Sequence, residues 1–450
     1  MDLSKVGDLG TKIAFCSLGC SKNLVDTEIM MGLLRDAGME IVSDEHLADV
    51  ILVNTCSFIA DAAQESVDAI LDYADLRADG RLQALLVTGC LPQRYGVELM
   101  REIPEIDGII GTGQFGRCVE AVEDAVAGRR PAFLDDPGYL QPADAPRVVT
   151  TPAHYAYLKI GEGCANRCAY CIIPSIRGGV QSRPLEAVVG EAEKLVADGM
   201  REAIVIAQDT TVYGVDLYGV PSLAKLLRKL ARVEGLEWIR VMYAYPSRID
   251  DELVEVMAST PNIVKYIDLP MQHGSDRLLR AMNRHASRDQ MIEVVARLRE
   301  QVPGIVIRTS LIVGFPGETD RDFEELLDFI KIIRPERAGV FKFSREEGTR
   351  AYDMPEQVPD DVAEARRDAA MEALRRISRE YGLSRVGSKV RVIVDGPSDE
   401  SDLVVEARSF AEAPDVDGKI YIGDATLRPG QLVDVIIEDA SDYDLAAVLV

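Results

Sequence analysis

The chain has 450 residues and a formal net charge of −25, and 47% of its residues are hydrophobic. This length exceeds what one hydrophobic core usually serves, so we expect two to four domains. The acidic balance disfavours non-specific nucleic-acid binding and favours basic partners. No apolar run approaches the roughly 20 residues of a membrane span, and the N-terminus lacks a signal-peptide pattern. We therefore expect a cytoplasmic protein with no membrane contact, whose eight cysteines are ligands rather than disulfides.

Three apolar segments in the first part of the chain are each followed by a cysteine. The segments are 12–19, 49–55 and 83–89, and the cysteines are Cys20, Cys56 and Cys90. Such runs predict buried parallel strands, and the amphipathic stretches 24–37 and 62–76 between them predict helices. The alternation predicts an open parallel α/β sheet whose strand ends share one edge. The three cysteines should therefore converge, and converging thiolates suit an iron–sulfur cluster.

Other readings of this domain stay open. A single cysteine at a strand end is more often packed than reactive, so three structural cysteines are the alternative. Cys16 lies inside the first predicted strand and Cys118 in the helical run 115–127, and we assign both to the core or the surface. The segment 111–116 matches the G-x-G-x-x-G spacing of dinucleotide-binding turns. Because it comes last in the domain, it predicts only a tight turn before a helix.

A proline-rich stretch separates this domain from the next. Residues 129–149 are rich in Pro, Asp and Ala. Proline fixes φ and removes a hydrogen-bond donor, so we expect an extended linker that crosses the surface.

Six strand-like runs then alternate with amphipathic helices. They are 155–160, 203–208, 238–243, 264–269, 305–312 and 340–343. Six β/α units predict a parallel barrel or partial barrel with its site at the carboxyl edge of the strands. Cys164, Cys168 and Cys171 follow the first strand as C-x3-C-x2-C, a spacing that lets three thiolates ligate one cluster and leaves one iron open. Zinc is the alternative, but structural zinc takes four ligands and no further Cys or His follows nearby.

Further polar or flexible residues follow the other predicted strands. Gln208 and Asp209 end the second strand, and Gly314 and Gly317 follow the fifth. Glycine lets a backbone approach a ligand closely, although an ordinary turn explains such glycines equally well. His273 follows the fourth strand, and a buried histidine bonded to a neighbour is the simpler interpretation.

The last part of the chain predicts one long helix and a small barrel. Residues 360–381 form an amphipathic pattern. Short β segments with closely spaced turns follow at 390–395, 403–408, 420–422 and 432–438, which is typical of a small antiparallel barrel. Residues 384–450 hold six basic and fourteen acidic side chains, a net charge of −8. Such a barrel would repel phosphates and fits a basic protein partner.

These motifs together resemble a known family. The C-x3-C-x2-C loop, with Tyr170 before its last cysteine, resembles the radical S-adenosylmethionine (SAM) signature. Segments 18–28, 53–58 and 87–94 resemble the N-terminal domain of the methylthiotransferases, and the last barrel resembles a TRAM domain. The resemblance implies an α/β protein with an N-terminal open parallel α/β domain, a central partial TIM barrel of the (β/α)6 type and a C-terminal antiparallel barrel. The implied boundaries are 10–128, 129–149 for the linker, 150–382 and 383–450.

The resemblance also implies cofactors and contacts. Two 4Fe–4S clusters are implied, an auxiliary one at Cys20, Cys56 and Cys90 and a SAM-binding one at Cys164, Cys168 and Cys171. In the family one SAM methylates sulfur on the auxiliary cluster, and a second yields the radical that removes hydrogen from the substrate. Implied SAM contacts are Gln208, Asp209, Arg308, Gly314 and Gly317. An electron donor such as flavodoxin or ferredoxin is implied, and acid–base residues stay unassigned.

The substrate is implied by two features. Gln272-His273 resembles the branch that modifies a ribosomal protein, whereas tRNA-modifying relatives usually carry Gln-Ser there. Together with the acidic barrel, this implies methylthiolation of an aspartate of small-subunit ribosomal protein twelve and no direct tRNA binding. The alternatives are a tRNA methylthiotransferase with the same clusters, a non-enzymatic iron–sulfur scaffold and a zinc-binding adaptor.

Overall fold

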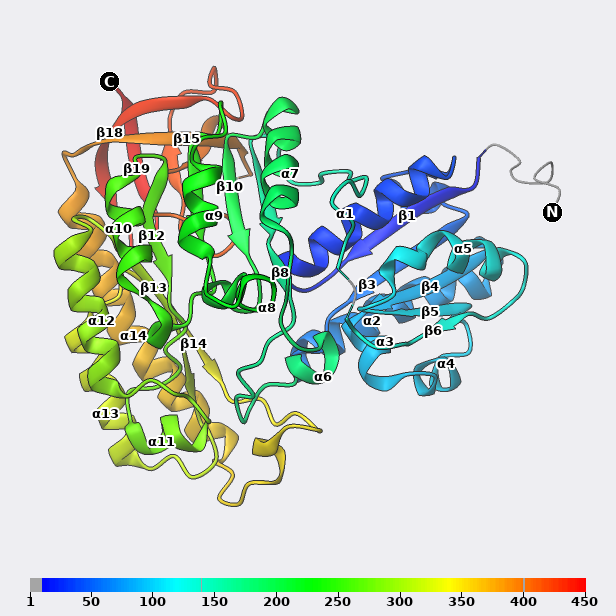
Figure 1. Cartoon of the computed structure of the whole chain (residues 1–450), viewed down its shortest axis with the longest axis horizontal. Coiled ribbons are helices and arrows are strands. Elements are labelled where there is room, and N and C mark those ends of the chain that lie inside the picture. Colours follow the sequence, from blue (N-terminus) through cyan, green and yellow to red (C-terminus); the bar gives the residue numbers. More distant parts are fainter. Residues whose placement is uncertain (1–9, 139, 400) are drawn as a thin grey trace.

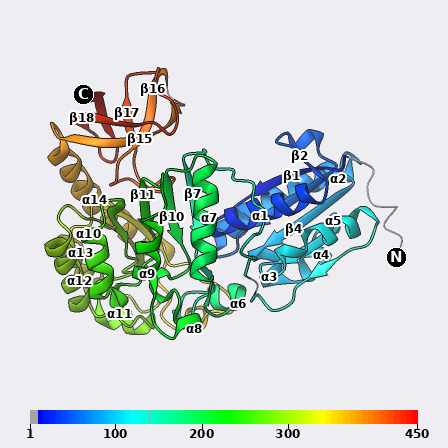
Figure 2. The same ribbon diagram turned by 45° about the horizontal axis from the view of Figure 1, so that its top comes forward.

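The computed structural model describes residues 10–138, 140–399 and 401–450. It contains two six-stranded parallel sheets and a closed five-stranded barrel (Figure 1). Figure 2 shows the barrel standing above the central sheet and the N-terminal domain lying beside it. No helix in the described ranges is long and apolar enough to cross a membrane.

The N-terminal sheet has the strand order β2-β1-β3-β4-β5-β6. Its strands are β1 Lys12–Ser17, β2 Glu40–Ile41, β3 Val50–Thr55, β4 Ala84–Gly89, β5 Gly108–Gly111 and β6 Ala132–Phe133. Its helices are α1 Ser21–Asp36, α2 Ala60–Ala78, α3 Cys90–Tyr95, α4 Glu98–Glu102 and α5 Cys118–Val126. The three predicted strands and the helices between them are confirmed.

The predicted linker differs from the structure at one point. Its residues 132–133 form β6, which pairs with β5 at the edge of the sheet, so the stretch is not wholly an extended surface crossing. The Ile109 amide donates to the Pro131 carbonyl at 2.9 Å. A proline-rich segment can take this place because an edge strand needs hydrogen-bond donors on one side only.

The central sheet has the order β14-β13-β12-β11-β10-β7, and all its pairs are parallel. The strands are β7 Tyr155–Lys159, β10 Glu202–Ile206, β11 Trp238–Val241, β12 Ile263–Asp268, β13 Val306–Val313 and β14 Arg337–Lys342. The six predicted strands are confirmed. Because β7 and β14 lie at opposite edges, the sheet is an open partial barrel. A short β8–β9 pair, Gly161–Glu162 and Gln181–Ser182, follows β7.

Helices cover one face of this sheet. They are α7 Leu185–Ala197, α9 Leu223–Leu230, α10 Asp251–Ser259, α12 Arg288–Gln301, α13 Asp320–Ile333 and α14 Asp360–Arg385. The short helices α6 Ile173–Arg177, α8 Val215–Tyr218 and α11 Asp276–Ala281 lie in the connections between strands. Alternate strand residues such as Leu158, Val205 and Val241 pack beneath the helices. The other face carries Ile204 and Met242, which share a buried cluster with residues of the N-terminal and C-terminal parts of the chain. The second face is therefore where the three domains meet.

The C-terminal barrel closes in the order β15-β16-β17-β19-β18. Its strands are β15 Lys389–Ser398, β16 Ser401–Arg408, β17 Ile420–Ile422, β18 Leu432–Ala440 and β19 Leu445–Leu449. The predicted small barrel is confirmed, with one parallel pair, β17–β19, among antiparallel ones. The sequence patterns did not predict β19.

The 409–417 segment between β16 and β17 packs the barrel against the second face of the central sheet. The Arg240 guanidinium donates to the Phe410 carbonyl at 2.8 Å, and the Tyr266 hydroxyl donates to Asp417 at 2.7 Å. A buried ion pair of 2.7 Å between Arg408 and Glu202 adds a second connection. These contacts fix the barrel to the central sheet, and the 409–417 segment covers part of the second face of that sheet.

Candidate active site

The first three cysteines meet at one edge of the N-terminal sheet, as the N-terminal triplet Cys20, Cys56 and Cys90. Cys20 precedes α1, Cys56 follows β3 and Cys90 begins α3 directly after β4. A Cβ added to Gly19 would lie 2.7 Å from the Cβ of Cys56, so the first two strand ends touch. Burial raises the pKa of the Cys90 thiol to about 12, with Arg177 acting to lower it and the nearby Cys20 and Cys56 adding to the rise. Cys20 is exposed while the other two are buried.

Asn23 holds this edge together. Its side-chain amide donates to the carbonyls of Leu18 at 3.1 Å and Thr55 at 2.9 Å. The Asn54 side chain donates to the Asn23 carbonyl at 2.8 Å. The start of α1 is therefore tied to the ends of β1 and β3. Sequence reasoning missed Asn23, and its position three residues after Cys20 was the available signal.

The second set, the central triplet Cys164, Cys168 and Cys171, lies on one loop after β8. The Cys171 amide donates to the Cys168 carbonyl at 3.1 Å, which folds the loop back on itself. The Ala169 amide donates to the Met282 carbonyl at 2.8 Å and anchors it. Burial, together with the nearby Cys168 and Cys164, raises the pKa of the Cys171 thiol to about 12. All three thiols are half-buried.

One arginine lies against each triplet. Arg177 Nη2 is 3.7 Å from the Cys90 sulfur, and Arg284 Nη1 is 3.8 Å from the Cys168 sulfur. A guanidinium beside a sulfur favours the thiolate, which is the form that ligates metals. Sequence reasoning missed both arginines, because neither belongs to a spacing that marks it.

The chemistry of each donor set fits an iron–sulfur cluster. Within the ranges that the structure describes, no three His, Cys, Asp or Glu side chains close around one metal ion. In a 4Fe–4S cluster each thiolate ligates a different iron, so three cysteines can serve one cluster. Each site offers three cysteines with an arginine beside one of them.

A buried charge network contacts the N-terminal triplet at Cys90 and includes Glu162, two residues before Cys164. The Glu162 carboxylate accepts hydrogen bonds at 3.1 Å from both Lys159 and Arg177, and it also accepts from Gln208. Arg177 donates to Asp26 of α1 at 2.7 Å. Burial alone would raise the pKa of Glu162, but Arg177 and Lys159 lower it to about 2. The two acids and two bases therefore form a charged, mutually compensated set beside the N-terminal triplet.

The predicted SAM contacts at the end of β10 lie beside the central triplet. Asp209 accepts from Asn166 of the cysteine loop at 2.7 Å and from the Thr211 amide at 3.0 Å. Gln208 Oε1 is buried with no hydrogen-bond partner among the described residues. A buried acceptor without a donor is suited to a ligand amino group.

Arg308 has different surroundings. It donates to Asp268 at the end of β12 at 2.9 Å, and its Nε lies 3.7 Å from Asp417 of the 409–417 segment. Both partners are buried carboxylates, and neither belongs to the cysteine loop. A SAM contact by Arg308 stays a prediction that would require it to exchange a partner.

The two predicted glycines have local structural reasons. Gly314 has φ of +76°, and a Cβ there would lie 2.6 Å from the Cβ of Ala363 in α14. Gly317 has φ of +78°, and its amide donates to the Glu356 carbonyl at 2.8 Å. Glycine is the residue that adopts such backbone angles without strain. The turn explains both glycines, and their contact with SAM stays a prediction.

His273 is buried, as the simpler interpretation expected. Its Nδ1 accepts from the Ser275 amide at 2.9 Å, and burial lowers its pKa to about 3. The segment 111–116 likewise forms a turn, in which Thr112 donates to the Ile176 carbonyl at 2.5 Å. A Cβ on Gly113 would lie 2.5 Å from the Asp136 carbonyl oxygen, so the linker covers this turn.

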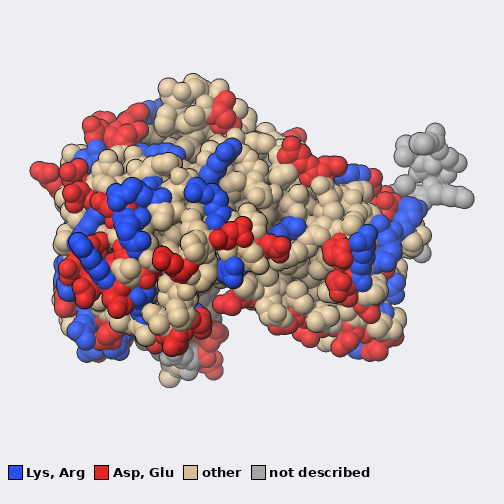
Figure 3. Space-filling view, turned by 90° about the horizontal axis from the view of Figure 1, so that it is seen from below, with Lys and Arg blue, Asp and Glu red and all other residues tan. Residues whose placement is uncertain are grey.

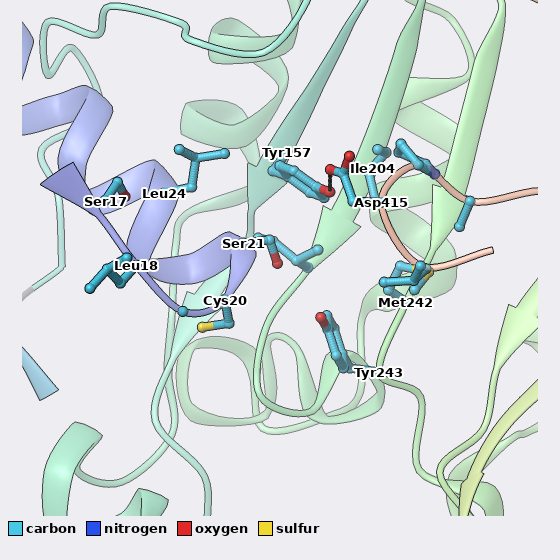
Figure 4. Close-up of a pocket in the computed structure, with 15 residues that line it drawn as sticks. Ser17, Leu18, Cys20, Ser21, Leu24, Tyr157, Ile204, Met242, Tyr243 and Asp415 are labelled. Atoms are coloured by element: carbon cyan, nitrogen blue, oxygen red, sulfur yellow. Dashed lines mark hydrogen bonds between the residues drawn. The ribbon is translucent and has the colours of Figure 1, made fainter. Parts of the chain in front are cut away.

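A cavity of about 300 Å³ lies where the three domains meet (Figure 4). Its walls come from the end of β1 with the start of α1, from the second face of the central sheet, and from residues 413–416. Cys20 and Tyr243 lie on its wall, and the Tyr157 hydroxyl donates to Asp415 at 2.9 Å. Asp415 is the one charged residue on the described wall. Because the wall comes from three domains, no local sequence pattern could have predicted it.

The fold and the site define a radical SAM enzyme, in which a parallel partial barrel places a C-x3-C-x2-C loop after its first strand. Residues 158–330 match the Radical SAM superfamily, residues 12–111 the Uncharacterized protein family UPF0004 and residues 386–450 the TRAM domain. The chain belongs to the RimO family of radical SAM methylthiotransferases. It is 49% identical to the ribosomal protein uS12 methylthiotransferase RimO of Trichlorobacter lovleyi, over 98% of both chains. It is also 49% identical to the protein of that name from Geobacter sulfurreducens, again over 98% of both.

A solved structure supports the fold. The radical S-adenosylmethionine methyltransferase TsrM from Kitasatospora setae superposes with a TM-score of 0.55 at 16% identity. The match covers 74% of this chain and 75% of TsrM. At this identity the likeness concerns the fold alone.

Proposed function

We propose that this enzyme transfers a methylthio group to the β-carbon of an aspartate in ribosomal protein uS12. The relatives that are nearly half identical over the whole length are described as uS12 methylthiotransferases. The observation that carries the proposal is a buried charge network that contacts Cys90 through Arg177 and reaches Glu162, two residues before Cys164, beside a cavity on which Cys20 opens.

The cysteines have distinct roles in this proposal. Two 4Fe–4S clusters and SAM supply, when bound, the electron, the carbon radical and the sulfur for such a transfer. The N-terminal triplet would hold the auxiliary cluster, and the central triplet would hold the cluster that binds SAM. A C–H bond at the aspartate β-carbon is not acidic enough for a side-chain base, so radical chemistry fits the reaction.

Other residues of the chain would bind SAM and exclude water from the cavity. Gln208 Oε1, which lacks a donor, and Asp209 would bind the SAM amino group. Ile204, Ile206 and Met242 line the cavity with apolar surface. Such a wall excludes water from a reaction in which a radical must meet only its substrate.

Charge supports a protein substrate over tRNA. Three of the fourteen acidic residues of the barrel region, Asp395, Glu412 and Asp417, serve interior ion pairs, and the rest of the region stays acidic on balance. Figure 3 shows acidic and basic side chains interspersed, with no continuous basic track over the described residues on that face. Nucleic-acid binding needs phosphates to be neutralised by Lys and Arg. A tRNA methylthiotransferase is therefore the less favoured alternative. We further propose a cytoplasmic enzyme that is reduced by flavodoxin or ferredoxin.

The test offers both substrates to the same enzyme. Anaerobically reconstituted protein, SAM and a reductant are incubated with uS12 or with unmodified tRNA, and the products are analysed by mass spectrometry. We expect one added methylthio group on an aspartate of uS12 and none on tRNA. Gain on tRNA alone would replace the substrate while keeping the chemistry. SAM cleavage without gain on either would refute the uS12 proposal.

A further inference from the structure

Lys22 is a buried cation without a carboxylate partner. It lies in α1 two residues after Cys20, and only 6% of its surface is exposed. Its Nζ lies 3.0 Å from the centre of the Tyr243 ring. Every other buried Lys or Arg side chain in the described ranges forms an ion pair with Asp or Glu. Lys22 therefore departs from the pattern of the buried Lys and Arg side chains in the described ranges.

This exception has an energetic consequence. Removing an ammonium from water is costly unless a counter-charge compensates it. A cation–π contact with tyrosine contributes about 0.5–2 kcal/mol, which offsets only part of that cost. The site therefore favours an anion that the described chain does not itself supply.

Lys22 adjoins the cavity at the junction of the domains. Tyr243, whose ring it contacts, lines that cavity together with Cys20 and Ser21 (Figure 4). Tyr243 has a positive φ of 55°, and its amide donates to Asp268 at 3.1 Å, which fixes the ring in place. Asp415, on the cavity wall, accepts from Tyr157 and forms no ion pair with Lys22.

We propose that Lys22 binds the side-chain carboxylate of the substrate aspartate and thereby selects an acidic side chain for modification. This inference rests on the proposed function. Lys22 Nζ lies against the ring of Tyr243, a residue of the cavity wall, and the β-carbon of an aspartate is bonded directly to the carboxylate carbon. Asp415, the one acidic residue on the described wall, accepts a hydrogen bond from Tyr157 and does not neutralise Lys22. The positive charge of Lys22 therefore remains to pair with the negative charge of the bound aspartate.

A binding cycle tests the pairing. The anaerobic, reconstituted full-length enzyme and its Lys22→Met variant are each titrated with uS12 and with uS12 whose target aspartate is replaced by asparagine, and Kd is measured by fluorescence anisotropy. We expect Lys22→Met to weaken binding of unaltered uS12 about 10-fold or more, as for a charge-assisted hydrogen bond. The asparagine form should bind both enzymes with equal, weakened affinity.

Two variants separate recognition from folding. Lys225→Met is the matched control, because Lys225 is exposed and its Nζ lies 5.6 Å from the centre of the Tyr218 ring. This variant should bind uS12 with the same affinity as the unaltered enzyme. Lys22→Arg keeps the charge and should retain most of the discrimination between the two substrates. If Lys22→Met does not fold, the loss of affinity of the unaltered enzyme for the asparagine substrate still tests the pairing.

The contrary outcomes are distinct. Equal weakening of both substrates by Lys22→Met would assign Lys22 a structural role and overturn the inference. Unchanged affinity would also overturn it, while methylthiolation of uS12 by the unaltered enzyme would leave the proposed function intact. If the unaltered enzyme binds no uS12, the inference and the proposed function fail together.

Discussion

The two cysteine triplets bring three thiols together in different ways. The central triplet lies on a single loop, and its backbone hydrogen bond from Cys171 to Cys168 is local. The N-terminal triplet comes from three separate strand ends, which only the parallel sheet brings together. The first arrangement is encoded by spacing and the second by topology. The auxiliary cluster site that we propose would thus need no continuous motif, because the carboxyl ends of parallel strands share one edge.

The triplets also differ in how their arginines are held. Arg177 beside Cys90 is paired with Asp26 and Glu162 in a buried network. Arg284 beside Cys168 instead donates to the Pro270 carbonyl at 2.6 Å and lies 4.0 Å from the centre of the Tyr245 ring. The charge of Arg177 is compensated within the protein, whereas that of Arg284 is left for the cluster site. This difference makes the two sites separable by mutation.

The largest expected effect divides the labour between the triplets. Cys168→Ala should abolish reductive SAM cleavage, because the site would keep two of its three thiolates. Cys56→Ala should leave SAM cleavage in place and abolish methylthiolation of uS12. Iron content, 5′-deoxyadenosine and the methylthio product are measured for both. Equal SAM cleavage by the two variants would contradict the division, and Cys16→Ala is the control that should keep both activities.

A smaller effect should follow from the arginines. Removing a cation beside a cluster disfavours its more negative reduced form, so Arg177→Gln should lower the midpoint potential of the N-terminal cluster alone. Arg284→Gln should lower that of the central cluster alone. Loss of such outer contacts typically costs about 10–100-fold in activity or metal affinity. Redox titration followed by electron paramagnetic resonance measures both, with the exposed Arg321→Gln as control. A shift of both potentials in either variant would show that the sites are not independent.

The smallest expected effect is a loss of folding stability at acidic pH that originates at His273. His273 is buried with its pKa lowered to about 3, so the folded state binds fewer protons than the unfolded state below about pH 6.5. Stability is therefore full above that pH and should fall by about 2 kcal/mol at pH 5. His273→Gln should remove this part of the pH dependence, and His46→Gln, at an exposed position, should not.

The measurement is denaturant unfolding at pH 7 and pH 5. It is followed by the fluorescence of Trp238, the single tryptophan, which lies in β11 of the central sheet. If His273→Gln lost as much stability between pH 7 and pH 5 as the unaltered protein, His273 would not be the cause of that loss.

Much of the fold could be predicted because its strands are long apolar runs. The six strands of the central sheet and β1, β3 and β4 each stood out by hydrophobicity, as did four of the five barrel strands. The missed strands β2, β5, β6, β8 and β9 have four residues or fewer, and hydrogen bonding to a neighbour defines them more than composition does. The missed β19 completes the barrel through pairs with β17 and β18.

The sequence by itself determined which residues can ligate clusters, because cysteine spacing and strand ends are properties of the local chain. It also determined the class of fold and the acidic character of the last barrel. Only the tertiary structure decided that Arg177 lies against Cys90, that residues 413–416 line the cavity and that Lys22 is buried without a carboxylate. Each of these depends on side chains from distant parts of the chain. Their contacts and burial arise only when the domains pack together, so no local pattern records them.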